Sequence, residues 1–285
     1  MSWEVAIALN LYWGYDLATA LESVKRCGAE YVDIDFLGPL PFKEKAILSH
    51  LSLQDLDEPS RVQKLLEVNQ LKTITFSGHM DLSSSENVNL FLRKMEFAKA
   101  LGIKYIAAFA GLKTKARDFF NNTGRVIQKA EELEMVVVLE TETPGDLLPS
   151  GAEAIRVLQQ IGSDRIRLLY DFGNVYFANK GKVNLIEDFA KALDIIGVVH
   201  LKDPIIDLPF LAYTEIGKGI FDYTTILKYI RNSGRRFPVV LEIPYFIRSR
   251  SWEPFEISSA QKSLHEIEEI AKRSLEFVKK HLNNH

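Results

Sequence analysis

The sequence contains a single cysteine, Cys27, among its 285 residues, so the chain cannot form an internal disulfide. It also lacks an apolar run long enough to span a bilayer. Its first residues lack the basic segment and following apolar segment that mark a secretory signal peptide. Basic side chains are not in excess, because 35 lysines and arginines face 38 aspartates and glutamates. These absences predict a cytoplasmic protein with neither a membrane nor a nucleic acid as a partner.

The sequence does contain short, strongly apolar segments that end in a carboxylate. In Val136–Glu142, three valines and a leucine lead directly into Glu140. The segment Val239–Pro244 repeats this pattern and places Glu242 at the matching position. A continuous apolar run of this length is typical of a parallel strand that is buried on both faces. A carboxylate at its end must be paired, hydrogen-bonded or bound to a metal.

Strands of this kind alternate with amphipathic helices along the whole chain. Asp16 precedes the first helix as an N-cap, and Gly28 and Gly162 follow helices as C-terminal glycines. The predicted strands are Trp3–Tyr12, Tyr31–Leu37, Leu71–Ser77, Lys104–Ala110, Val136–Thr141, Ile166–Asp171, Ile196–Leu201 and Val239–Ile243. The predicted helices are Leu17–Cys27, Pro59–Asn69, Asn87–Leu101, Lys115–Glu134, Gly151–Ile161, Leu185–Leu193, Asp222–Asn232 and Ser263–His281.

This alternation decides the fold class that we expect. Strict alternation predicts a parallel sheet with helical crossovers. Eight such units in a chain of this length predict an α/β fold that closes into a (β/α)8 TIM barrel. No domain boundary is apparent, so residues 1–285 are expected to form one domain.

Four of the predicted strands end in a side chain that can bind a metal. These side chains are Glu140, Asp171, His200 and Glu242, which lie on the last four strands in chain order. Because the carboxyl ends of barrel strands open onto one face, we expect the four side chains to meet. Three carboxylates and one imidazole form an oxygen-rich set that suits Mn²⁺, Mg²⁺, Co²⁺ or Zn²⁺.

Six short motifs lie at the ends of these strands or just after them. They are Ser77–Leu82 (SGHMDL), Leu139–Glu140, Tyr170–Asn174 (YDFGN), Val199–Asp203 (VHLKD), Gly217–Asp222 (GKGIFD) and Leu241–Glu242. In these motifs, and over nearly its whole length, the chain resembles the xylose isomerase-like TIM barrels of the sugar phosphate isomerase/epimerase superfamily. The last five motifs, in this order, are specific to the superfamily but not to one reaction.

The resemblance implies a metal site and a reaction class. Glu140, Asp171, His200 and Glu242 would hold one divalent metal ion, with Mn²⁺ favoured, and His79 would face the substrate. Such an ion polarises a substrate carbonyl and stabilises an enediolate. Glu140 and Glu242 would each exchange a proton with a substrate carbon as the acid/base pair. The implied activity is isomerisation or epimerisation of a small sugar or ketose.

Two departures from the family pattern bear on the substrate. Asn174 stands where many members have the histidine of an Asp-x-x-His motif, and no arginine stands shortly after the histidine of the seventh strand, in Lys202–Ile206. Neither feature favours a strict ketose 3-epimerase. We expect Asn174 to bind a substrate hydroxyl, and Lys202 either to contact a substrate oxygen or to be a solvated lysine at a strand end. Trp13, with Phe36 and Trp252, is expected to supply an aromatic wall for the sugar.

Specificity is expected in the segments between strands and helices. We interpret four of them as loops: Gly38–Ser60, Gly111–Lys115, Asp203–Glu215 and Pro244–Lys262. Arg248 and Arg250 lie in the last of these loops and are candidates for binding a phosphate or a carboxylate.

Three alternatives remain at this stage. The same site could serve a dehydratase, a lyase that acts on an inosose or a 3-dehydroshikimate-like compound through the same enolate. An endonuclease IV-like barrel would need additional histidines for three zinc ions, and Gly111 and Asn174 stand near where these would be wanted. A non-catalytic barrel would not need the intact set of four ligands. The helix predicted over Ser263–His281 could support a homodimer or homotetramer.

Overall fold

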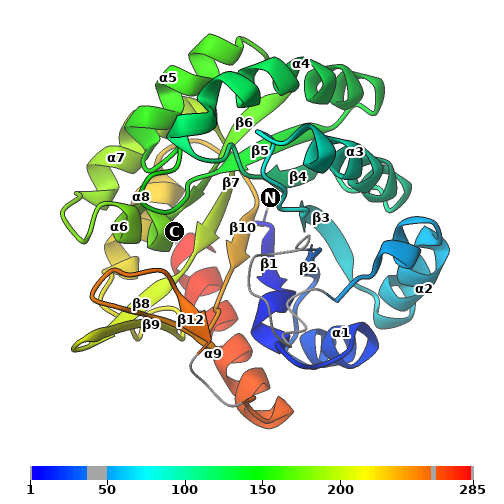
Figure 1. Cartoon of the computed structure of the whole chain (residues 1–285). Helices are drawn as coiled ribbons and strands as arrows, with labels where there is room; N and C mark the ends of the chain where they lie inside the picture. The colour runs from blue at the N-terminus through cyan, green and yellow to red at the C-terminus, as the bar shows by residue number, and fades with distance from the viewer. Residues whose placement is uncertain (1, 37–49, 258–260, 284–285) are drawn as a thin grey trace.

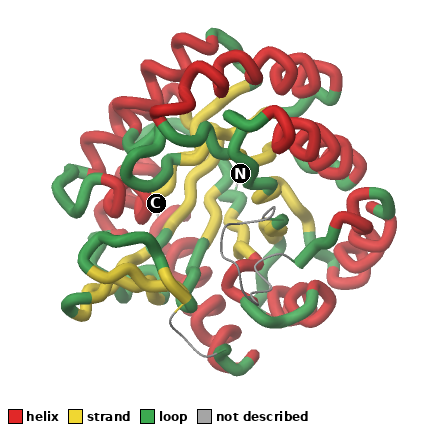
Figure 2. The backbone as a smooth tube through the Cα atoms, viewed as in Figure 1, coloured by secondary structure: helices red, strands yellow, loops and turns green. Residues whose placement is uncertain are grey.

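The computed structural model describes residues 2–36, 50–257 and 261–283. Eight parallel strands close into a barrel in the order β1-β10-β7-β6-β5-β4-β3-β2, and helices surround it (Figures 1 and 2). The barrel strands are β1 (Val5–Ala8), β2 (Tyr31–Asp35), β3 (Lys72–Ser77), β4 (Tyr105–Ala108), β5 (Val136–Glu140), β6 (Ile166–Asp171), β7 (Ile196–Leu201) and β10 (Val239–Leu241). The predicted (β/α)8 TIM barrel is confirmed.

All eight predicted helices are present, with ends that differ by a few residues at most. Local signals explain several of these ends: Asp16 accepts a hydrogen bond from the Thr19 backbone N–H at 3.0 Å, and Gly162 ends its helix in the left-handed conformation. The helices are α1 (Leu17–Arg26), α2 (Pro59–Asn69), α3 (Ser85–Ala100), α4 (Ala116–Glu132), α5 (Gly151–Ile161), α7 (Leu185–Ala192), α8 (Tyr223–Asn232) and α9 (Leu264–Asn283).

The inside of the barrel contains small and aliphatic side chains below the strand ends, with buried polar side chains on β2 and β3. Successive residues of a strand point to opposite faces, so every second residue faces the barrel axis. The apolar inward residues form a cluster separate from the main core, consisting of Ala6, Ala8, Ala107, Val138, Leu169, Val198 and Val240. This layer closes the barrel below the strand ends, so any site must lie above it.

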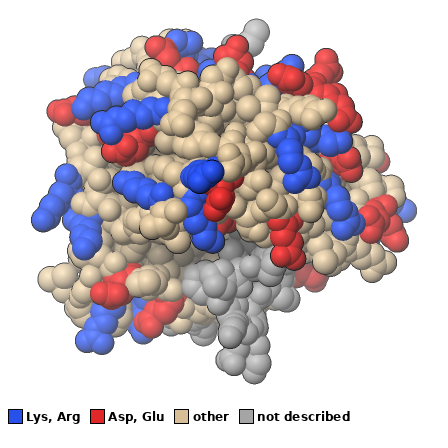
Figure 3. All heavy atoms as spheres, turned by 45° about the horizontal axis from the view of Figure 1, so that its top comes forward, with Lys and Arg blue, Asp and Glu red and all other residues tan. Residues whose placement is uncertain are grey.

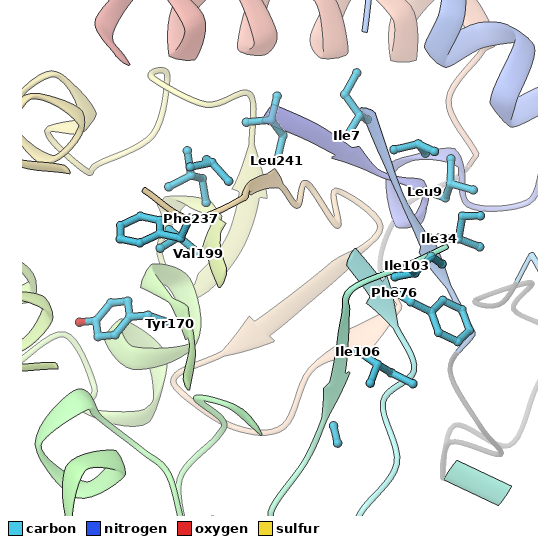
Figure 4. Packing of buried hydrophobic residues seen from close by; sticks show 14 of the residues in the cluster. Ile7, Leu9, Ile34, Phe76, Ile103, Ile106, Tyr170, Val199, Phe237 and Leu241 are labelled. Carbon is cyan, nitrogen blue, oxygen red and sulfur yellow. The ribbon is translucent and has the colours of Figure 1, made fainter. Parts of the chain in front are cut away.

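The outward residues of the strands pack against the helices and form the main core. Figure 4 shows Ile7 and Leu241 pointing from β1 and β10 toward α9. On another side, the Phe76 ring of β3 lies 5.6 Å from the Phe97 ring of α3. Because these side chains are almost fully buried, each contributes about 1.5–3 kcal/mol to folding by removal from water. The strand positions are therefore fixed from outside.

Two predicted loops prove to contain strands, so that part of the prediction was wrong. The segments Asp203–Glu215 and Pro244–Lys262 supply a separate antiparallel sheet in the order β12-β11-β9-β8, seen beside the barrel in Figure 1. Its strands are β8 (Asp203–Asp207), β9 (Phe210–Thr214), β11 (Ile247–Arg250) and β12 (Glu256–Ile257). We call it the added sheet. Its short strands carry Pro204 and several charges, which are depleted in strands and hid the pattern.

Two smaller boundaries also differ from the prediction. The strand predicted over Trp3–Tyr12 ends at Ala8, and Leu9–Tyr12 forms a 3₁₀ turn. A short helix that was not predicted, α6 (Phe172–Ala178), begins directly after Asp171. Apolar content alone does not separate a strand from a short buried helix, and both segments are almost entirely buried.

Part of the predicted specificity loop Gly38–Ser60 lies outside the described residues. Its described end contains a 3₁₀ turn, Leu53–Leu56, and the start of α2. None of the helices in the described ranges is long and apolar enough to cross a membrane. The face in Figure 3 shows basic and acidic side chains interspersed, which agrees with the small net charge of −3.

Candidate functional site

The four predicted donor side chains stand one layer above the aliphatic filling of the barrel. Each of them lies two residues beyond an inward valine or leucine, as Glu140 follows Val138 on β5. By the same period, Asp171 follows Leu169, His200 follows Val198 and Glu242 follows Val240. The register of neighbouring strands places Asp171 opposite His200. The alternation of the strands therefore points all four donors toward the barrel axis, above the apolar side chains.

The donor atoms of Glu140, Asp171, His200 and Glu242 all lie within 4.8 Å of one another. The Nδ1 atom of His200 is 2.5 Å from Glu242 Oε2, 3.8 Å from Asp171 Oδ2 and 3.9 Å from Glu140 Oε1. Glu140, Asp171 and His200 are at most 2% exposed. The four side chains therefore lie close together, as the sequence predicts.

The Lys202 ammonium lies among the same carboxylates. Its Nζ atom is 2.9 Å from Glu242 Oε1, 3.1 Å from Asp171 Oδ2 and 3.8 Å from Glu140 Oε1. The residue is only 6% exposed, so the alternative of a solvated lysine is wrong. Lys202 follows His200 by two residues and points into the site by the same alternation.

Positively charged side chains offset part of the negative charge of the site. Burial alone would raise the pKa of Glu242, but the charges of Lys202 and His200 outweigh it and hold that pKa far below its usual value. Burial likewise opposes the charge on Lys202, but Asp171, Glu242 and Glu140 raise its pKa well above the usual range. Three carboxylates are therefore tolerated here only together with positive charge.

Each glutamate is held in place by one amide side chain. Asn174 Nδ2 donates to Glu140 Oε1 at 3.0 Å, and Asn10 Nδ2 donates to Glu242 Oε1 at 3.0 Å. Asn174 was a predicted site residue, whereas Asn10 was not. The signal that could have found Asn10 is its spacing of two from Ala8, which the overlong first strand concealed.

His79 contacts the opposite side of Glu140. Its Nε2 atom lies 2.6 Å from Glu140 Oε2, and its ring stacks on Phe109 with 4.5 Å between the ring centroids. The predicted aromatic Trp13 lies farther out and stacks on Phe246, with 5.2 Å between the ring centroids. Phe246 lines the cavity described next and Trp13 does not. Sequence spacing alone could not distinguish the two rings.

A cavity of about 740 Å³ opens above the donors. Its floor includes Glu140, Glu242, Lys202 and Asn174, and its wall includes His79. Aromatic side chains from several elements complete the lining: Phe109, Phe177, Tyr213, Phe246, Trp252 and Phe255. Glu142, which we had not assigned to the site, also lines it, and burial raises the pKa of its carboxyl well above the usual value. Of the predicted aromatic wall, only Trp252 reaches the cavity, because Phe36 is buried outside it.

Asp203 explains why its motif and the glycine-rich motif occur together. Its carboxylate accepts hydrogen bonds from the backbone N–H groups of Gly217 (2.8 Å), Gly219 (2.9 Å) and Phe221 (3.2 Å). A Cβ atom at Gly219 would overlap with this carboxylate and with the Pro204 carbonyl. The turn at Gly217–Phe221 is therefore hydrogen-bonded to Asp203, the residue that follows Lys202. This arrangement fixes the end of β7 and the start of the added sheet.

The donor set fits a divalent metal ion. Three carboxylates and one imidazole are the ligand types that Mn²⁺, Zn²⁺ and Co²⁺ accept. The Nε2 atom of His200 is buried and has no hydrogen-bond partner among the described residues. Positive charge is needed to hold the carboxylates together, and Lys202 and His200 lie among them. The residues could therefore exchange this charge for that of a bound ion.

Comparisons with known proteins place the chain in a family. The family model described as xylose isomerase-like TIM barrel matches residues 21–281. No curated protein matches the sequence. Solved structures with the same fold include 3-keto-D-glucoside 4-epimerase YcjR from E. coli, with 14% identity, TM-score 0.71 and coverage of 98% of this chain and 100% of that chain.

Two further structures have a similar relation to this chain. D-allulose 3-epimerase from Methylomonas sp. has 16% identity and TM-score 0.70, and the match covers 99% of this chain and 98% of that one. The IolI protein with a bound zinc atom has 17% identity and TM-score 0.73, and the match covers 99% of this chain and 100% of that one. Identities this low show a shared fold and not a shared substrate. On the match of the family model over most of its length, the chain belongs to the xylose isomerase-like TIM barrel family.

Proposed function

We propose that the protein is a divalent-metal-dependent sugar epimerase or isomerase that acts on a small sugar or ketose through an enediolate. The observation that carries the proposal is the meeting of Glu140, Asp171, His200 and Glu242, whose donor atoms lie within 4.8 Å of one another. The solved structures described as sugar epimerases support this reaction class, and the one described with a bound zinc atom supports a metal site.

The four side chains would hold one ion, with Mn²⁺ favoured and Mg²⁺, Co²⁺ or Zn²⁺ also suited to the donors. When bound, the ion supplies a Lewis acid that polarises a substrate carbonyl and lowers the cost of forming the enediolate. Lys202 lies beside Glu242 and Asp171 and is placed to donate a hydrogen bond to a substrate oxygen. His79 and Asn174, which line the same cavity, would bind substrate hydroxyls.

Glu140 and Glu242 are the proposed acid/base pair. Both line the cavity, and each is oriented by one amide donor, Asn174 or Asn10. One glutamate removes a proton from the carbon next to the carbonyl and the other returns a proton. Return to the opposite face of the same carbon gives an epimer. Return to the neighbouring carbon converts a ketose into an aldose.

Incubation of the metal-loaded protein with ketoses in D₂O tests the proposal. We expect one carbon-bound hydrogen of the substrate to be replaced by deuterium, together with an epimer or isomer, and no exchange after EDTA treatment. Formation of an enone absorbance with loss of water would assign the dehydratase alternative instead. A protein that binds no divalent ion, and whose melting temperature does not respond to Mn²⁺ or Co²⁺, would contradict both activities.

A further inference from the structure

The cavity has an aromatic wall that the proposed chemistry does not use. It is formed by Phe177 of α6, Tyr213 of β9, and Trp252 and Phe255 of the turn between β11 and β12, all of which line the cavity. The Phe177 ring lies 4.5 Å from Phe255 and 6.0 Å from Trp252, measured between ring centroids. Tyr213 lies 5.7 Å from Phe255. We call these four side chains the aromatic wall.

The backbone at Trp252 is held in an unusual conformation. Ser251 and Trp252 both have positive φ values, 51° and 69°, which are uncommon for residues other than glycine. The Ser251 backbone N–H donates to the Pro209 carbonyl at 2.9 Å, and the indole lies 5.7 Å from the Tyr176 ring. A strained turn persists only where its surroundings impose it. The position of Trp252 is therefore fixed by the added sheet.

The cavity is poorly suited to a charged substituent such as a phosphate. Among the lining residues that the structure describes there is no arginine, and the only lysine is Lys202, which is paired with carboxylates. The lining also includes the carboxyl group of Asp81, an acceptor that does not favour an anion. Arg248, a candidate anion ligand from the sequence, instead pairs with Glu256 at 2.8 Å and does not line the cavity.

The cavity is also larger than one small sugar requires. Its volume of about 740 Å³ lies within the range of about 300–1,000 Å³ that is typical of pockets for drug-sized ligands. A single ketose held at the four donors would fill only part of a cavity of this volume. Flat rings fill such space well, because both aryl groups and the faces of sugar rings pack on aromatic side chains.

The wall offers one polar group to a ligand. The Tyr213 hydroxyl is buried, and it has no hydrogen-bond partner among the described residues. A buried hydroxyl without a partner is costly. A ligand oxygen that lies between the donors and the wall, such as a glycosidic oxygen, would provide the missing partner.

We infer that the substrate is an uncharged sugar derivative that carries a second ring, a keto-glycoside, with the sugar at the four donors and the second ring on the aromatic wall. This rests on the proposed function for the identity of the reacting sugar. The second ring is an aryl group or another sugar, because both present a flat face and a linking oxygen.

Binding of non-reacting glycosides to the full chain tests the inference. Isothermal titration would compare phenyl β-D-glucopyranoside, cellobiose, methyl β-D-glucopyranoside and glucose 6-phosphate. We expect phenyl glucoside, cellobiose or both to bind at least tenfold more tightly than methyl glucoside, and glucose 6-phosphate to show no such gain. A gain for phenyl glucoside alone assigns an aryl group, and a gain for cellobiose alone assigns a second sugar.

Variants locate the preference. Trp252→Leu and, separately, Phe255→Leu should reduce the preference over methyl glucoside to less than threefold. Phe210→Leu is the control, because Phe210 belongs to the same sheet but lies outside the cavity, against Arg248. Thermal melting verifies that each variant is folded. Two wall variants are made so that the test can proceed if one of them does not fold.

Three results would overturn the inference: equal affinity for all uncharged probes, tighter binding of glucose 6-phosphate, or a preference that both folded wall variants retain. These results are distinguishable from a failure of the proposed function, because the preference for a second ring is measured by binding, without turnover. A clear preference without any exchange in D₂O would reject the proposed reaction alone. Exchange on free ketoses with no ring preference would reject only this inference.

Discussion

The barrel and the added sheet contribute to the same cavity in different ways. The barrel supplies every donor of the candidate metal site, each fixed by strand register and by the aliphatic layer beneath it. The added sheet supplies no donor but contributes Tyr213, and the turn beside its β11 carries Trp252. In the barrel the side chains are positioned by a closed hydrogen-bonded ladder. In the added sheet they are positioned by turns and by packing between rings.

This difference indicates that reaction and specificity are separable in this chain. Residues on barrel strands should alter the rate of the chemical step, whereas residues on the added sheet should alter which ligand is bound. A barrel substitution that changes only ligand preference, or an added-sheet substitution that changes only the chemical rate, would contradict this separation. Four changes test it, beginning with the one that should have the largest effect.

Glu242→Gln should lower kcat for exchange in D₂O by about 10²–10⁴-fold, because it removes one member of the acid/base pair. Glu140→Gln should have an effect of the same size. The matched control is Glu256→Gln, since Glu256 is an exposed glutamate on β12 of the added sheet. Near-normal turnover in Glu242→Gln or Glu140→Gln would disprove our assignment of the acid/base pair.

Asp203→Ala should destabilise the protein by about 3 kcal/mol, because three backbone N–H groups lose their acceptor. Asp203 lies where the barrel meets the added sheet, so this change should impair both regions. Chemical denaturation measures the loss. Asp207→Ala, an exposed position at the other end of β8, serves as the control and should change stability by no more than a few tenths of a kcal/mol. Equal stability of the two variants would show that the turn does not depend on the carboxylate.

Removal of the metal should lower the melting temperature and abolish exchange. At a free metal concentration one hundred times the Kd, binding contributes about 2.7 kcal/mol to stability. The shift should return with Mn²⁺ and should be absent in His200→Ala. His265→Ala changes an exposed histidine of α9 and should retain the full shift. A metal-dependent shift of normal size in His200→Ala would remove this residue from the ligand set.

Lys94→Met should have a smaller effect that depends on pH. Lys94 is fully buried in α3, and its ammonium donates to the carbonyls of Phe36 (2.6 Å) and Gly78 (2.7 Å). Burial lowers the pKa of Lys94 to about 7. Above that pH the unfolded chain still binds the proton and the folded chain does not, so stability from this group rises with pH. Below about pH 7 both states are protonated and the contribution is constant.

Denaturation of wild type and Lys94→Met at pH 6, 7, 8 and 9 measures this difference. The free energy of unfolding of the wild type minus that of Lys94→Met should rise with pH above 7, by on the order of 1 kcal/mol per pH unit. Lys99→Met, at an exposed position of the same helix, should show no such trend. If this difference stays constant or falls as the pH rises, Lys94 remains protonated in the folded protein.

The barrel was predictable because its signals are local and repeated. Each buried strand reads as a continuous apolar run, as in Val136–Glu140, and the helix ends carry caps such as Asp16. The meeting of the four donors followed from the fold, because strand ends in a barrel share one face. Their metal-binding and catalytic roles were predictions from the sequence and remain proposals.

The added sheet and the fine structure of the site were not predictable in the same way. The strands of the added sheet are short and partly exposed, and their pairing is set by partners far apart in sequence, such as Arg248 and Ala212. Burial of Lys202 depends on three carboxylates from other strands. The contribution of Asn10 depends on where β1 ends, which the apolar residues up to Tyr12 obscured.

The hydrogen bonds from Gly217, Gly219 and Phe221 to Asp203 have a consequence for how the sequence of the β8–β9 hairpin can vary in evolution. The β8–β9 hairpin leaves the barrel at Asp203 and returns at the turn that the same carboxylate holds. Both ends of the hairpin are therefore clamped at a single point next to the barrel. The length and sequence of the hairpin can therefore differ between relatives while His200 and Lys202 keep their positions, as long as β9 keeps its pairing with β11.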